Sequence, residues 1–183
     1  MAHEFSTSYI ADSTALFLYY KGLGERAIQQ LTDAELFEAL DSEGNSVAVI
    51  VKHIAGNMRS RWTDFLTSDG EKPDRNRDAE FEPDVTNSRD QLMMRWEAGW
   101  KVLFDALAPL SDDQLASKVF IRSEPHSVMQ AINRQIAHYA YHVGQIVFLA
   151  KHFRASEWKT LTVPRGKSVD FTKAVSEGKA SQR

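Results

Sequence analysis

Four long segments of the chain repeat apolar residues at the spacing of an α-helix, and this pattern constrains the fold most strongly. They cover about residues 7–31, 45–66, 87–107 and 125–153. No segment shows a convincing alternation of apolar and polar residues, the pattern of a half-buried strand. Because each segment carries one apolar face, the four faces can enclose a single core. The sequence therefore predicts an all-α four-helix bundle.

The longest turn-rich stretch lies between the second and third helical segments. Residues 68–85 are dense in charge and interrupted by glycine and proline, so we expect a long surface crossover there. The third helix would start at Thr86 or Asn87. After a briefly extended segment, residues 118–122, the fourth helix would start near Pro125, which suits a first helical turn. A crossover of this length is consistent with an up-down-down-up bundle.

The length of the chain sets the number of domains. With 183 residues, 43% of them hydrophobic, it can bury one sizeable core but is too short for two ordinary domains. Pro164 and Gly166 exclude a regular helix across that part of the tail, and we expect disorder beyond Asp170. The predicted division is a bundle domain, residues 1–168, followed by a disordered C-terminal tail, residues 169–183.

Composition excludes several classes of protein. A net charge of −3 and a pI near 6.1 lack the basic excess of a nucleic-acid-binding surface. The chain has no cysteine, so thiol chemistry would need an external thiol. The longest early apolar run, residues 15–20, is too short for a signal peptide or a membrane span. We therefore expect a cytoplasmic protein without nucleic-acid or membrane partners.

A pair of histidines in the fourth helical segment is the first candidate site. His138 and His142 are four residues apart, which places both imidazoles on one helix face within reach of one ion. Tyr139 stands where the metalloprotease helix motif has its glutamate, so that mechanism lacks its general base. A histidine pair at this spacing also fits two partly exposed side chains without a metal.

The surroundings of this pair favour a buried site. The pair belongs to a polar row next to the apolar face of its helix, formed by Gln135, His138, His142 and Gln145. His53 has a comparable place on the second helix, beside Ile50 and Ile54. Metal sites of helix bundles are built from side chains on facing helices, so three histidines could meet there. The other histidines, His3, His126 and His152, are assigned no metal role.

Around these histidines the sequence resembles the DinB-like superfamily of metal-binding four-helix bundles, which is named after damage-inducible proteins. The resemblance rests on residues 51–57 (VKHIAGN) and 138–145 (HYAYHVGQ). The stretches RSRWTDF, GEKP and NRD between residues 59 and 78 are similar to an uncharacterised bacterial family within it. Superfamily members bind metal through one histidine on the second helix and a His-x-x-x-His pair on the fourth. The resemblance implies His53, His138 and His142 as ligands of a divalent ion, with zinc or nickel preferred over iron, manganese or cobalt.

The resemblance also implies a class of function. Relatives with assigned activities are metal-dependent and often use a low-molecular-weight thiol, as in bacillithiol S-transferases and mycothiol-dependent maleylpyruvate isomerase. We expect a metal-dependent enzyme acting on a small molecule, with S-transfer preferred and a related hydrolysis as the other reaction. The alternatives are a non-catalytic metal or small-ligand binding protein of the stress response, and a structural dimer with a vestigial site.

Partners and catalytic residues are less constrained. Superfamily members are commonly dimers, so we expect a homodimer that uses the apolar tail around Trp158, Leu161 and Val163. Tyr141 flanks the expected ligands and could donate a hydrogen bond to a bound anion. A carboxylate of the substrate or cosubstrate could be bound by the arginines around the crossover, Arg59, Arg61, Arg75 and Arg77. Surface arginines more often form exposed ion pairs of little energy, and this reading applies to all four.

Overall fold

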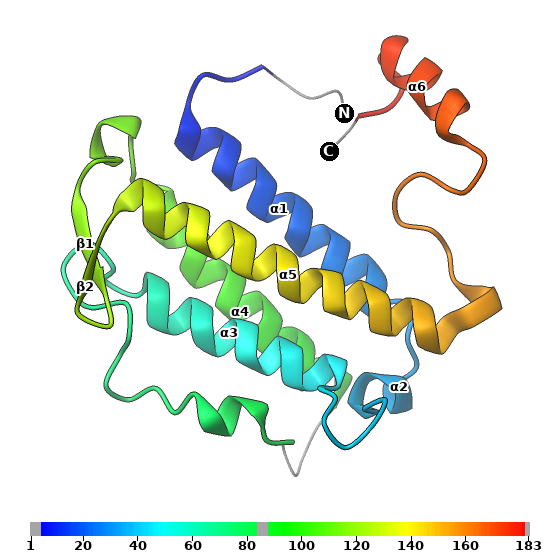
Figure 1. Cartoon of the computed structure of the whole chain (residues 1–183), viewed down its shortest axis with the longest axis horizontal. Coiled ribbons are helices and arrows are strands. Elements are labelled where there is room, and N and C mark those ends of the chain that lie inside the picture. Colours follow the sequence, from blue (N-terminus) through cyan, green and yellow to red (C-terminus); the bar gives the residue numbers. More distant parts are fainter. Residues whose placement is uncertain (1–4, 84–87, 182–183) are drawn as a thin grey trace.

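The computed structural model describes residues 5–83 and 88–181 of the chain. Its long helices are α1 (Tyr9–Ile28), α3 (Val47–Trp62), α4 (Arg89–Leu107) and α5 (Val128–Arg154). In Figure 1, α1 and α5 run in one direction and α3 and α4 in the other, and the chain after α3 returns along the bundle. The predicted all-α bundle with up-down-down-up order is confirmed.

Serine begins each of the four long helices. The side-chain oxygen of the capping serine accepts a hydrogen bond from the backbone N–H three residues later, which satisfies one of the amides that a helix start leaves unpaired. The caps are Ser8, Ser46, Ser88 and Ser127. Thr86 and Asn87, where the third helix was expected to start, lie outside the described residues.

The helices pack mainly in two pairs, α3 with α4 and α1 with α5. The core between them is rich in large aromatic side chains, and Phe17, Trp96, Trp100 and Tyr139 are almost completely buried. α3 and α4 approach closely at Gly99, where a Cβ atom would lie 2.9 Å from the Cα of Ala55. These contacts fix the position of α3 along the bundle axis. They thereby also position the side chains that α3 presents to α5.

A short hairpin before α5 differs from the sequence prediction. β1 (Lys118–Ile121) pairs antiparallel with β2 (Glu124–Ser127), and Pro125 lies in β2, opposite Phe120. The expected helix start at Pro125 is therefore wrong. The helix begins at Val128 because Ser127 and Gln130 form a reciprocal capping box. Strands of four residues are too short to produce a recognisable alternation.

Shorter helices complete the chain. They are α2 (Asp33–Phe37), α6 (Ser168–Ser176) and the 3-10 turns η1 (Asp78–Phe81), η2 (Asp112–Gln114) and η3 (Ala155–Glu157). α6 occupies the segment where the sequence predicted disorder, although none of its residues is buried. None of the helices in the described chain combines the length and hydrophobicity needed to cross a bilayer.

The segment after α5 packs on the bundle itself. Trp158 and Leu161 are partly buried against the core of their own chain. Gln30, just after α1, exchanges two hydrogen bonds with the backbone of Lys159, at 2.8 and 3.0 Å. Their own bundle therefore already covers part of the apolar surface that was expected to face a neighbouring subunit.

Candidate metal centre

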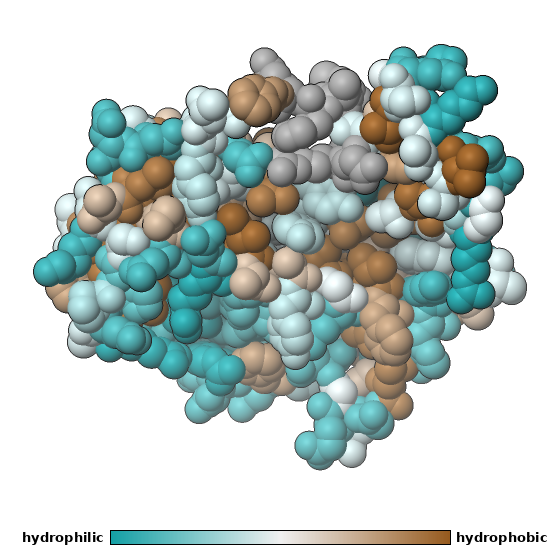
Figure 2. Space-filling view, turned by 45° about the horizontal axis from the view of Figure 1, so that its top comes forward, coloured by the Kyte–Doolittle hydropathy of each residue, from teal (hydrophilic) through white to brown (hydrophobic). Residues whose placement is uncertain are grey.

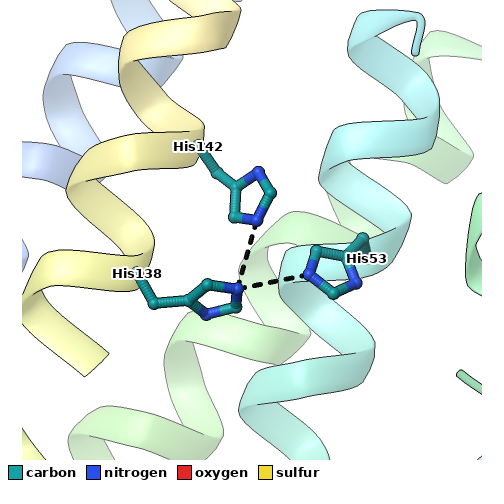
Figure 3. A group of neighbouring side chains, drawn as sticks. All are labelled: His53, His138 and His142. Atoms are coloured by element: carbon teal, nitrogen blue, oxygen red, sulfur yellow. Dashed lines mark hydrogen bonds between the residues drawn. The ribbon is translucent and has the colours of Figure 1, made fainter. Parts of the chain in front are cut away.

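The structure brings together the three histidines that the sequence singled out. His53 projects from α3, and His138 and His142 project from adjacent turns of α5 toward it (Figure 3). The Nε2 atom of His138 lies 3.3 Å from that of His53 and 3.1 Å from that of His142. One ligand atom from each residue falls within 4.8 Å of the other two. Among the described residues this is the cluster of metal-binding side chains that could share one ion.

The spacing of these nitrogens fits one small cation. Nitrogen ligands bind zinc at about 2.0–2.1 Å, so two of them in a tetrahedral site lie about 3.3–3.4 Å apart. The two Nε2 distances at His138 are close to this value. His53 and His142 are buried and His138 is half-buried. The geometry therefore fits an ion held by three imidazoles with further coordination positions open.

Hydrogen bonds fix the tautomers of two of the rings. Nδ1 of His53 lies 2.8 Å from a carboxylate oxygen of Glu80, and Nδ1 of His142 lies 2.8 Å from the amide oxygen of Gln145. Both oxygens accept, so each Nδ1 carries a proton and Nε2 is the nitrogen that each ring can offer to a metal. Histidines that bind a metal through one ring nitrogen typically donate a hydrogen bond from the N–H of the other in this way. The contacts thus aim two lone pairs at the position between the rings.

The ring of His138 cannot donate a hydrogen bond to the Nε2 lone pairs of both other histidines. Burial, together with the neighbouring His142 and His53, lowers the pKa of His138 to about 3, so its ring is neutral near pH 7. Burial also lowers the pKa of His142. A neutral His138 offers at most one N–H at Nε2 to two facing lone pairs. A cation that accepts all three lone pairs satisfies the cluster better.

Glu80, the partner of His53, is itself held by an arginine. Nε and Nη2 of Arg75 donate to the two carboxylate oxygens of Glu80 at 2.8 and 2.9 Å, and both side chains are almost fully buried. Burial alone would raise the pKa of Glu80, but the hydrogen bonds from His53 and Arg75 hold it below its ordinary value. Phe81 packs over the His53 ring, with ring centroids 4.6 Å apart. The crossover before α4 therefore supplies the support of His53.

A second hydrogen-bond chain joins α3 to α5 below the histidines. The indole N–H of Trp62 donates to the hydroxyl of Tyr139, and that hydroxyl donates to the amide oxygen of Asn57, both at 3.1 Å. Burial raises the pKa of Tyr139 far above its usual range, so the hydroxyl keeps its proton and remains a donor. Because Tyr139 is next to His138 in the sequence, these hydrogen bonds help to fix the position of His138 on α5 relative to α3.

The histidines open into a pocket of about 580 Å³. Tyr141 and Arg61, two of the candidate catalytic residues, line this pocket; Tyr141 is well exposed and Arg61 is buried. Arg59, the third candidate, is not among the lining residues and pairs with Asp74 on the surface, at 2.5 Å. The further lining residues are Asn45, Asn57, Arg75, Arg77, Phe81, Arg122, Arg134, Gln135 and Gln145.

Several of these residues were not identified from the sequence. Glu80 is one of seven acidic residues within positions 68–85, and nothing in the local pattern distinguishes it from the others. Arg134 precedes His138 by one helical turn, which is the signal that could have found it. Of the histidines assigned no metal role, His126 lies in the hairpin and His152 is exposed near the end of α5. His3 lies outside the described residues.

The fold and the histidine cluster define the class of protein. The chain superposes on YfiT from Bacillus subtilis with a TM-score of 0.64 and 17% identity, covering 84% of this chain and 92% of that one. YfiT is described as a probable metal-dependent hydrolase with an unusual four-helix bundle topology. This likeness confirms the expected four-helix bundle fold.

The particular family follows from the sequence. Residues 4–167 match the model of a protein family of unknown function, DUF1572, and the chain belongs to this family. The expected membership of an uncharacterised family is thus confirmed. No curated protein matches the chain.

Proposed function

We propose that the chain is a metal-dependent enzyme that holds one divalent ion on His53, His138 and His142 and acts on a small molecule. The observation that carries the proposal is the convergence of three Nε2 atoms, two of them with fixed tautomers, at one side of a pocket. The likeness of the fold to YfiT, described as a metal-dependent hydrolase, supports the same class of activity. Zinc and nickel suit a site of three imidazoles, and iron, manganese or cobalt are the other candidates.

A divalent ion at this position would act as a Lewis acid and lower the pKa of a thiol or a water, which makes a nucleophile near neutral pH. The chain orients and shields that chemistry. Glu80 and Gln145 hold the ligand rings in place through their Nδ1 atoms. Tyr141 lines the pocket and its ring packs beside His142, so its hydroxyl could donate a hydrogen bond to the substrate. Arg61, at the same pocket, adds positive charge that favours an anionic reactant.

The two reactions differ in the source of the nucleophile. Since the chain has no cysteine, S-transfer would use a low-molecular-weight thiol that enters the pocket, and this is the reaction we favour. Hydrolysis would use water in the same position. A pocket of about 580 Å³ is of the usual size for a small-molecule site and has room for a thiol beside a small electrophile.

The test uses protein purified without a histidine tag, because tag histidines bind the same ions. Elemental analysis should find about one equivalent of a divalent metal. The loaded protein should accelerate conjugation of bacillithiol or a related thiol to monochlorobimane, or hydrolysis of an activated ester, and chelation should remove the effect. If the metal is present but neither thiol conjugation nor ester hydrolysis shows a metal-dependent rate, the protein is the non-catalytic metal or small-ligand binder.

Self-association is a separate part of the proposal. We expect a homodimer, and the surface that could form it includes exposed hydrophobic side chains such as Phe148 and Leu18, 64% and 54% exposed. On the face shown in Figure 2, hydrophobic side chains lie among hydrophilic ones, several of them on the side of the C-terminal segment. Light scattering should give about twice the chain mass of 20.7 kDa. A monomer at all micromolar concentrations would contradict the expectation.

A further inference from the structure

Arginines dominate the wall of the pocket next to the three histidines. Five of them line it, Arg61, Arg75, Arg77, Arg122 and Arg134, and no aspartate or glutamate is among its lining residues. The protein as a whole carries a net charge of −3, so this concentration of positive charge is local. A cavity lined by one sign of charge raises the local concentration of oppositely charged small molecules.

Two of the five arginines are occupied by the structure itself. Arg75 binds both oxygens of Glu80 and also lies 3.3 Å from Glu71. Arg61 donates to Glu71 at 2.8 Å and to the carbonyl oxygen of Gly70. Their side chains are only 5% and 6% exposed, so they act mainly in holding the crossover against α3.

The remaining three arginines keep donors available. Arg134 forms no ion pair with any other described residue, is exposed, and lies one helical turn before His138 on α5. Arg122 contacts Glu71 through Nε at 3.2 Å, which leaves both of its terminal nitrogens uncommitted; its side chain is 57% exposed. Arg77 is half-exposed and packs over the Phe81 ring, with Asp78 at 3.9 Å. These side chains present guanidinium groups to the same pocket from α5, the hairpin and the crossover.

The charges around the pocket do not cancel. Glu71 and Glu80 are the carboxylates bound by its arginines, so five positive charges face two negative ones. With Asp78 beside Arg77 and Asp69, which accepts from the backbone N–H groups of Arg122 and Ser123, also counted, an excess of one remains. A divalent ion on the histidines would raise the positive excess further.

We propose that this arginine wall binds the anionic group of a small-molecule substrate, a carboxylate or a phosphate oxyanion. Arg134 is the primary contact and Arg122 and Arg77 complete the site. Guanidinium groups bind both kinds of oxyanion through paired, charge-assisted hydrogen bonds. The inference rests on the proposed function for the role of the histidines, because an anion held at Arg134 lies one turn from His138. It deepens that function by naming the substrate class, and it excludes cationic substrates.

The test compares small probes of matched shape and different charge. Metal-free protein is titrated with benzoate, benzamide and benzamidine, which share a ring and carry negative, neutral and positive head groups, and with phenylphosphonate. Binding is followed by ligand-observed NMR. We expect binding of benzoate or phenylphosphonate, with little binding of benzamide or benzamidine. The stronger of the two anions identifies the preferred oxyanion. Equal binding of benzoate and benzamide would overturn the proposal.

Variants assign the binding to the pocket. Arg134→Gln should lower the affinity for the anion by about tenfold or more, the change expected when a charge-assisted contact is lost. Arg122→Gln should lower this affinity less. The matched control is Arg165→Gln, which removes an exposed arginine of the C-terminal segment and should change nothing. An Arg134→Gln protein that binds benzoate and phenylphosphonate as tightly as the parent would refute the site.

Metal analysis separates this inference from the proposed function. Arg134→Gln should retain its equivalent of zinc, because Arg134 touches none of the three ligands. If the parent binds the anion through Arg134 but holds no metal, the proposed function fails and the anion site stands. If the parent holds the metal while the anion binds equally to parent and Arg134→Gln, the anion site fails and the metal centre stands.

Discussion

Three imidazoles that face one another across α3 and α5 are the residues on which the metal proposal depends. Replacing His53 by alanine removes the ligand from α3 and leaves both ligands of α5. We expect His53→Ala to lose most of the affinity for zinc, as measured by competition with a chromogenic chelator. His152→Ala, which changes an exposed histidine on α5, is the control and should bind as the parent does. Unchanged affinity in His53→Ala would mean that α3 supplies no ligand.

Glu80 acts on the metal through His53. Glu80→Gln keeps a hydrogen-bond acceptor near Nδ1 but removes the negative charge that strengthens the imidazole as a ligand. Changes at such supporting residues typically lower metal affinity about 10–100-fold. We expect a loss in that range for Glu80→Gln in a zinc titration. Glu82→Gln is the matched control in the same crossover, because Glu82 is exposed. Equal affinity in the two variants would exclude this role for Glu80.

The sequence predicts some residues of this site and misses others for a physical reason. The spacing of four between His138 and His142 fixes their relative position as soon as the segment is helical, and the resemblance to known bundles adds His53. Glu80 contacts His53, and Arg122 lines the same pocket, through tertiary packing of the crossover and the hairpin. No local pattern encodes those contacts, because irregular segments have no periodicity from which a facing side chain could be inferred.

Helix α4 reaches its place next to α3 because glycine allows a close approach. Gly99→Ala would put a Cβ 2.9 Å from the Cα of Ala55, so the two helices would have to separate. Overpacking of this kind typically costs about 1–3 kcal/mol, which corresponds to several degrees in the melting temperature of a protein of this size. We expect this loss for Gly99→Ala in thermal denaturation.

Gly144 provides the control in another helix. A Cβ there meets no atom within 4 Å, so Gly144→Ala gains helix propensity without a clash. The expected effect is a stabilisation of roughly 0.5–1 kcal/mol. A destabilisation of Gly144→Ala equal to that of Gly99→Ala would show that the crossing of α3 and α4 is not the cause.

Long elements could be predicted and short ones could not. The apolar faces of the four long helices each span several turns, which gives a clear period. α2 has five residues, little more than one helical turn, and each hairpin strand has four, only two repeats of its alternation, so neither pattern stands out from its surroundings. Proline is tolerated both in the first turn of a helix and in an edge strand, so the sequence around Pro125 fits either element. The pairing of Pro125 with Phe120 in the hairpin makes it part of a strand.

At the scale of the whole molecule, the C-terminal segment has two parts with different relations to the bundle. Trp158 and Leu161 pack on the core and the backbone of Lys159 bonds to Gln30, whereas α6 buries no residue. The match to the family model also ends at residue 167. We therefore expect the bundle and its metal centre to need the chain as far as Lys167 and nothing beyond it.

Two truncations test this division. A chain ending at Lys167 should have a free energy of unfolding within about 0.5 kcal/mol of that of the full chain, which is the usual effect of a surface change. It should also bind zinc as tightly as the full chain. A chain ending at Glu157 exposes the core surface that Trp158 and Leu161 cover and should lose roughly 2 kcal/mol or more. Urea denaturation of the three chains measures both differences. A large loss on removing only residues 168–183 would show that α6 stabilises the bundle, and the predicted domain boundary at residue 168 would then be wrong.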